Sequence, residues 1–129
     1  MSESIDNKIK LTPYFTLVGA ESFVDYMVTV FGANVIKDCR NISGTIQHAR
    51  LKIDDSIIML NEADKNYSPN RSQMHLYVGS VESIYNLAIA NGSVSLMSPM
   101  LRSHGDKMAG FKDPFGNIWW VAENRLKEK

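Results

Sequence analysis

The chain has 129 residues, which is enough for one domain with its own hydrophobic core. Fourteen basic and fourteen acidic residues give a formal net charge of zero without a basic cluster, which argues against nucleic acid and anionic membranes as partners. No apolar run approaches the ~20 residues of a membrane span. The N-terminus lacks a signal peptide's apolar region, and the single cysteine, Cys39, excludes a disulfide within the chain. We therefore expect a cytoplasmic protein.

The first half of the chain predicts a strand, a helix and three further strands. Residues 1–8 are polar and are expected to be disordered. The first strand is predicted over 11–18, where Pro13 favours a strand start or a sheet edge. A helix follows, because helical spacing joins Phe23, Met27, Val30 and Phe31 in one apolar stripe. The three remaining strands are predicted over 34–40, 45–53 and 57–60.

The second half repeats this order. Strands are predicted over 73–78, 94–97, 107–112 and 118–121, with a helix between the first two and a loop over 98–106. Gly92 follows Gly32 by 60 residues, and each glycine lies where a helix would end. Two apolar helix stripes that each end in a glycine, 60 residues apart, indicate a degenerate internal repeat. We expect a single domain over 9–123, built from a βαβββ module at 9–63 and another at 73–123, with a C-terminal tail at 124–129.

The segment before the last predicted strand has the composition of a tight turn. Asp113 can bind backbone groups two residues on, Pro114 restricts its own φ, and Gly116 allows a positive φ. The strand that follows carries Trp119 and Trp120, whose large apolar surfaces are costly to leave in water. We therefore expect this strand to lie inside a sheet, with packing against both faces.

Motifs along nearly the whole chain resemble a known superfamily. They are Thr12-Pro13-Tyr14, Phe31-Gly32-Ala33, His48 to Ile53, Met59-Leu60, His75 to Val78, Gly105-Asp106-Lys107 and Asp113 to Trp119. The resemblance is to the vicinal-oxygen-chelate superfamily of glyoxalase I, bleomycin-resistance proteins and extradiol dioxygenases, and more narrowly to its PhnB-like group. It implies an α+β fold in which two βαβββ modules form a curved mixed β-sheet around a cleft, with the helices on the outer face. It also implies a homodimer in which the partner completes each cleft.

Metal enzymes of this superfamily hold their ion on the first and last strand of each module. Carried over by strand register, the resemblance places these positions at Pro13, Met59, Gln73 and Trp120. Only the glutamine could coordinate a hard or borderline ion, so we expect no cofactor. The alternative is one divalent metal ion held by His48, His75 and Glu123, although nothing in the sequence shows that these three converge.

The same register points Trp120 into the cleft, where its indole would offer a stacking face and one N–H donor. The alternative is that Trp120 only packs, and that the cleft is a collapsed core. The expected ligand-binding residues are Phe15, Met59, Asn61, Gln73, His75, His104, Phe111 and Trp120. Of these, His75 could equally be a hydrogen-bonded strand residue, and His104 an exposed loop residue.

A mostly apolar concavity with few polar groups is typical of a small-molecule site. We expect a metal-independent binding protein, of the sequestration or resistance type, for an aromatic or amphipathic small molecule. The first alternative is a metal-dependent lyase, isomerase or dioxygenase with an unusual ligand set. The second is an interaction module whose cleft is filled by side chains. No catalytic residue is assigned.

Overall fold

The computed structural model describes residues 11–124. The predicted disordered segment 1–8 and residues 125–129 of the predicted tail lie outside this range. Module one comprises β1 (Tyr14–Leu17), α2 (Ala20–Phe31), β2 (Asn34–Arg40), β3 (Ile46–Ile53) and β4 (Ser56–Glu62). Module two comprises β5 (Gln73–Tyr77), α3 (Val81–Ala90), β6 (Val94–Leu101), β7 (Asp106–Lys112) and β8 (Ile118–Asn124).

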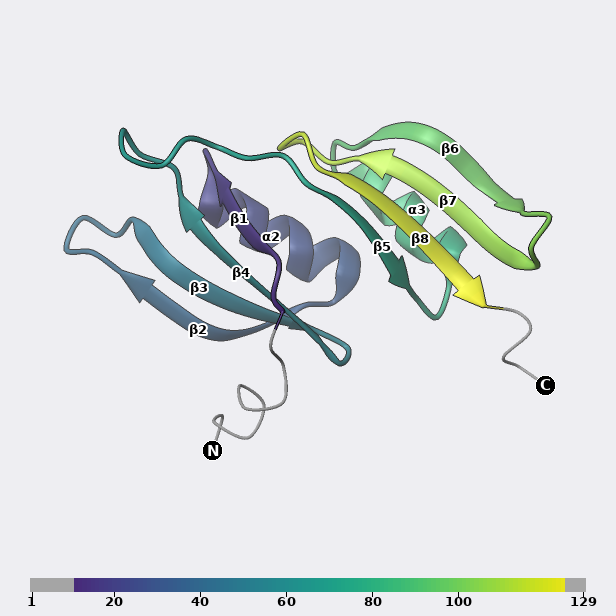
Figure 1. Ribbon diagram of the computed structural model, residues 1–129, viewed down its shortest axis with the longest axis horizontal. Helices are drawn as coiled ribbons and strands as arrows, with labels where there is room; N and C mark the ends of the chain where they lie inside the picture. The colour runs from purple at the N-terminus through teal and green to yellow at the C-terminus, as the bar shows by residue number, and fades with distance from the viewer. Residues whose placement is uncertain (1–10, 125–129) are drawn as a thin grey trace.

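Each module forms one four-stranded mixed sheet. The strand order is β1-β4-β3-β2 in the first sheet and β5-β8-β7-β6 in the second. In both sheets the first and last strands of the module are parallel neighbours, and the other pairs are antiparallel. The two sheets lie side by side, and both helices lie behind them in Figure 1. The predicted α+β architecture of two βαβββ modules is therefore confirmed, as two sheets between which the described strands form no ladder.

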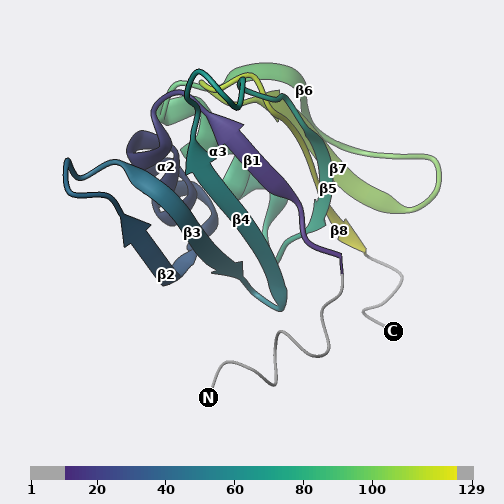
Figure 2. The ribbon, with the colours of Figure 1, turned by 60° about the vertical axis from the view of Figure 1, so that its left-hand side comes forward.

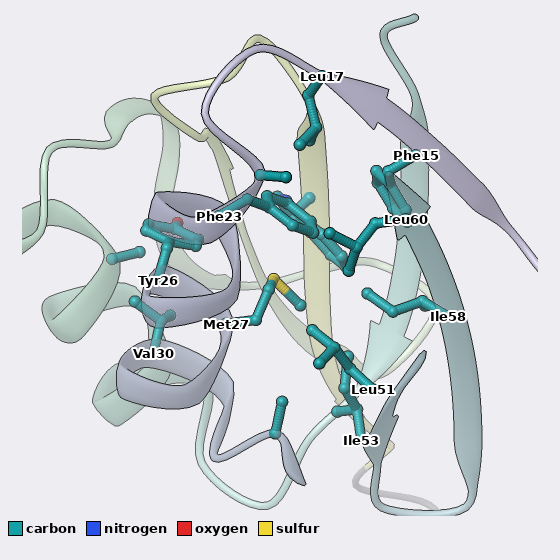
Figure 3. Packing of buried hydrophobic residues seen from close by; sticks show 14 of the residues in the cluster. Phe15, Leu17, Phe23, Tyr26, Met27, Val30, Leu51, Ile53, Ile58 and Leu60 are labelled. Carbon is teal, nitrogen blue, oxygen red and sulfur yellow. The ribbon is translucent and has the colours of Figure 1, made fainter. Parts of the chain in front are cut away.

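The hydrophobic core lies on the helix side and is shared by the two modules. Phe15 of β1 stacks on Trp119 of β8, with ring centroids 6.0 Å apart. Phe31 at the end of α2 contacts the same indole at 4.7 Å. Figure 3 shows side chains of α2 facing those of β1, β3 and β4 in this core. Aromatic contacts between modules join two half-domains, neither of which buries its sheet alone.

The predicted turn before β8 is confirmed. Asp113 is only 3% exposed, and its Oδ1 accepts hydrogen bonds from the backbone N–H groups of Phe115 and Asn117, both at 2.9 Å. Its Oδ2 accepts from Trp119 Nε1 at 2.9 Å. Gly116 has a φ of 91°, the left-handed conformation that glycine adopts readily. The turn thus orients the start of β8 and fixes the buried tryptophan.

The prediction for the sixth strand was too short. A strand over 94–97 and a loop over 98–106 were expected, whereas β6 continues to Leu101 and pairs with β7 through two register shifts. Pro99 lacks the N–H of an interior ladder, but β6 is the outer strand of its sheet and tolerates a proline. The β6–β7 hairpin consequently projects beyond the other strands, as the turned view shows (Figure 2).

Candidate functional site

The helix-free face of module two carries Trp120 in its centre. Trp120 is half-buried and lies opposite Gly110 of the neighbouring strand β7. A Cβ atom at Gly110 would lie 2.2 Å from Cζ3 of the indole, so the ring lies directly against the glycine backbone. The absence of a side chain at position 110 therefore allows the indole to lie on the sheet, with its other face turned away from the strand.

Gln73 orients the same indole from the other side. Nε1 of Trp120 donates a hydrogen bond of 2.7 Å to Oε1 of Gln73, which lies on the adjacent strand β5. A ring held by one hydrogen bond and by contact with a backbone loses little further freedom when a ligand stacks on it. The structure thus places Trp120 on the open face of the sheet, where the carried-over register put it.

A hollow of about 560 Å3 lies over this indole, within the range of small-molecule sites. It is lined by His75, Leu96, Met97, Arg102, His104, Met108 and Trp120. Three of these, His75, His104 and Trp120, were predicted from the sequence. The other four were missed: Leu96, Met97 and Met108 lie on strands that the sequence predicted without a facing, and Arg102 lies in the predicted loop.

The hollow is lined by apolar side chains together with basic groups. Nη1 of Arg102 contacts the sulfur atoms of Met97 at 3.3 Å and Met100 at 3.8 Å. No acidic residue is among the lining residues. Nearby, Asp106 accepts a hydrogen bond of 3.0 Å from the hydroxyl of Tyr77, and this bond raises the pKa of Tyr77 above its usual value.

Two predicted cleft residues belong to the core instead. Phe15 and Phe111 are fully buried on the helix side of their sheets, so the expectation that they extend the cleft wall is corrected. Successive side chains of a strand alternate between the two faces. Phe15 therefore faces away from its neighbours Tyr14 and Thr16, which occupy the open face.

Two further predicted residues lie on the open face of module one. Met59 pairs with Tyr14 of β1, and Asn61 accepts a hydrogen bond of 2.7 Å from the hydroxyl of Thr16. Both side chains are partly buried. They belong to the other sheet and do not line the hollow at Trp120.

The three residues of the alternative metal site, His48, His75 and Glu123, do not converge. Nδ1 of His48 lies 3.1 Å from the hydroxyl of Tyr14 in module one, whereas Glu123 accepts a hydrogen bond of 2.7 Å from the backbone N–H of Val81 at the start of α3. Over residues 11–124 no group of three or more His, Cys, Asp or Glu side chains is placed to hold a metal ion. The proposed triad of His48, His75 and Glu123 is therefore corrected for a single chain.

The positions implied by the resemblance fit a metal no better. Proline and tryptophan provide no ligand atom at positions 13 and 120, and the thioether of Met59 suits only soft metals. The amide oxygen of Gln73 already accepts the indole N–H. This donor set does not match the oxygen and imidazole ligands that a divalent Lewis acid requires.

A smaller hollow of about 260 Å3 lies between the modules. Its lining includes Pro13, Ile57, Met74 and Trp119, and it also reaches His75. The lining is mainly apolar, and its polar residues are Asp55, Ser56 and His75. The hollow over Trp120 is larger and adds the guanidinium of Arg102 to an aromatic face, so it is the stronger candidate.

The fold places this chain among known structures. No protein-family model matches the sequence. TioX from Micromonospora sp. ML1 superposes with a TM-score of 0.72 at 21% identity, covering 89% of this chain and 99% of TioX. A PhnB protein from Bacillus cereus, described as a putative 3-demethylubiquinone-9 3-methyltransferase, gives 0.73 at 16% identity, with 89% and 99% covered. A glyoxalase/bleomycin resistance protein/dioxygenase family enzyme from Burkholderia phytofirmans PsJN gives 0.68 at 17% identity, with 86% and 94% covered. The chain has the vicinal-oxygen-chelate fold.

Relatives by sequence come from mycobacteria. An uncharacterized protein of Mycobacterium bovis, Mb0911c, is 26% identical over 124 residues, which cover 88% of this chain and 82% of the relative. Rv0887c of Mycobacterium tuberculosis, also uncharacterized, has the same identity, with 88% of this chain and 73% of the relative covered. Between residues 11 and 124, neither helix has the length and apolar character needed to cross a membrane.

Proposed function

We propose that this protein binds a small aromatic or amphipathic molecule in the hollow over Trp120 and acts by holding it, as a sequestration or resistance protein does. The observation that carries the proposal is the orientation of Trp120, which lies against Gly110 and is fixed by Gln73. The thioether side chains of Met97 and Met108 line the same hollow, and thioethers adapt to varied ligand shapes. A fixed aromatic face with adaptable walls favours binding of a ring system.

The binding we propose needs no metal. In support, the positions at which the superfamily holds its ion carry the wrong donors here, and two of the alternative ligands, His48 and Glu123, make hydrogen bonds elsewhere in the fold. A metal-dependent lyase, isomerase or dioxygenase would need at least three convergent ligands. No observation on the described part of the chain favours that alternative.

The proposed assembly is a homodimer that closes the hollow along β6. Four large apolar side chains of this edge strand are exposed, namely Val94, Leu96, Met100 and Leu101. An unpaired strand edge with apolar side chains is prone to association with another chain. Leu96 and Met97 also line the hollow, so a second copy docked along β6 would cover its open side.

The binding proposal is tested with N-phenylnaphthylamine, a neutral aromatic probe whose fluorescence rises in apolar surroundings. We expect saturable binding to the native protein and about tenfold weaker binding to Trp120→Ala, because a stacking face is lost. Tyr67→Ala is the matched control, since Tyr67 is an exposed aromatic residue in the loop between the modules. Equal affinities for the native protein and Trp120→Ala would contradict the proposal.

Metal independence is tested in the same titration. The protein is dialysed against a chelator, analysed for residual metal, and titrated with and without added zinc or manganese. We expect the same affinity in each case. Probe binding that requires about one metal ion per chain would refute this part of the proposal.

A further inference from the structure

Arg102 is the arginine that lines the hollow over Trp120, and its contacts differ from those of Arg40 and Lys107. Arg40 lies 3.0 Å from the carboxylates of both Glu21 and Asp38, and Lys107 lies 3.0 Å from that of Glu82. Among residues 11–124, Arg102 has no such carboxylate partner, and its contacts are the sulfur atoms of two methionines. A thioether is a weak acceptor, whereas a guanidinium carries five N–H donors. The guanidinium is therefore available to an anion.

The surroundings of Arg102 also favour an anionic partner. The side chains that line the hollow carry no carboxylate. Asp106 lies close by in sequence, but it is buried and accepts the hydroxyl of Tyr77. His75 and His104 also line the hollow, and an imidazole offers at least one N–H donor in any protonation state. The polar groups facing the hollow are thus mainly donors.

The aromatic and cationic groups come from different elements. Trp120 lies on the floor of the hollow in β8, held against Gly110 and Gln73. Arg102 belongs to the turn region of the β6–β7 hairpin, which projects beyond the other strands (Figure 2). A ring stacked on the indole would therefore have an anionic substituent within reach of the hairpin. The planar guanidinium fork binds carboxylate, sulfonate or phosphate oxygens in pairs.

We infer that the ligand of this site is an aromatic anion, with its ring against Trp120 and its anionic group at Arg102. This inference rests on the proposed function and adds the chemical class of the ligand. His75 and His104 supply further donors at the rim. A cationic aromatic compound would meet Arg102 without a compensating carboxylate and would bind weakly.

The test compares two probes that share one ring skeleton. Anilinonaphthalene sulfonate carries an anionic group that N-phenylnaphthylamine lacks. We expect the native protein to bind the sulfonate about tenfold more tightly, since a charge-assisted hydrogen bond is added. In Arg102→Gln this preference should disappear, so that the two probes bind with about equal affinity. Arg40→Gln makes the same change of charge in module one and should keep the preference.

The outcomes separate the inference from the function on which it rests. A native protein that binds both probes equally, or an Arg102→Gln variant that keeps the sulfonate preference, overturns the inference and leaves the binding proposal standing. A native protein that binds neither probe, or binds both independently of Trp120, overturns the proposed function and the inference with it. Arg102→Lys gives a further readout, because it keeps the charge without the fork and should retain only part of the preference.

Discussion

At the scale of single residues, the candidate site depends on what position 110 lacks. Trp120 and Gly110 form a cross-strand pair, and the indole fills the space that a side chain at 110 would occupy. Gln73 then fixes the ring by its one N–H donor. Gly110 has no positive φ, so its role is to leave room and not to permit an unusual backbone conformation.

Gly110→Ala should displace the indole. The added Cβ would lie 2.2 Å from Cζ3, so the ring must rotate and lose its bond to Gln73. We expect a destabilisation of about 1–3 kcal/mol, a shift in Trp120 fluorescence and weaker binding of N-phenylnaphthylamine. Gly79→Ala is the control, because no atom lies within 4 Å of a Cβ there and its φ is not positive. Native-like fluorescence in Gly110→Ala would contradict the placement of the ring.

His48 should make stability depend on pH. Partial burial lowers its pKa below the usual value, and the positive charges of Arg50 and Lys37 lower it further. The unfolded chain therefore binds the proton more readily, and stability present above the unfolded pKa of about 6.5 is lost as pH falls through the folded pKa. Urea unfolding at several pH values between about 8 and 5 should show a smaller loss for His48→Gln than for the native protein. Parallel stability curves would show that His48 contributes nothing.

At the scale of elements, two carboxylates repeat the same contact in the two modules. Glu62 at the end of β4 accepts hydrogen bonds from the backbone N–H groups of Gly19 and Ala20, where α2 begins. Glu123 in β8 accepts from Val81, where α3 begins. A carboxylate at a helix N-terminus satisfies unpaired N–H groups and interacts favourably with the helix dipole. Each acid therefore joins the last strand of its module to the helix, and this contact gives Glu123 a structural role.

Asp113→Asn tests the hydrogen-bonded turn that precedes β8. A carboxylate can only accept hydrogen bonds. Oδ2 of Asp113 accepts them from Nε1 of Trp119 and Nδ2 of Asn117. An amide N–H2 in place of one oxygen would face these donors, so we expect a destabilisation of about 3 kcal/mol in urea unfolding. Asp64→Asn is the matched control, because its Oδ1 accepts two backbone N–H groups in an exposed turn. Equal stability of the two variants would show that the buried network contributes little.

At the scale of the whole molecule, the proposed homodimer accounts for the exposed apolar side chains of β6. Leu101→Lys places a charge on this edge, where Leu101 is 65% exposed, and should shift the protein from dimer to monomer in native mass measurements. Ile42→Lys is the control, since Ile42 is exposed in the β2–β3 hairpin of the other module. A native protein with the mass of one chain at micromolar concentration would refute the dimer.

The sequence by itself determined the two modules, their order of elements and the turn at Asp113. These features rest on apolar periodicity and on turn-forming residues, which act over a few neighbouring positions. The resemblance added the strand register that placed Trp120, Gln73 and His75 on one open face. Together with His104 of the loop after β6, these are the parts of the candidate site that could be predicted.

Only the tertiary structure decided which faces Phe15 and Phe111 occupy, where β6 ends, and that Arg102 joins Trp120 at one hollow. A register shift of one residue moves each side chain of a strand to the other face of the sheet. The face that a residue occupies therefore depends on how its strand pairs with distant segments. The contact between Trp120 and Gly110 likewise depends on the register of β7 with β8. Local sequence patterns specify elements, but the site arises where elements far apart in the chain meet, and their packing energies are properties of the folded whole.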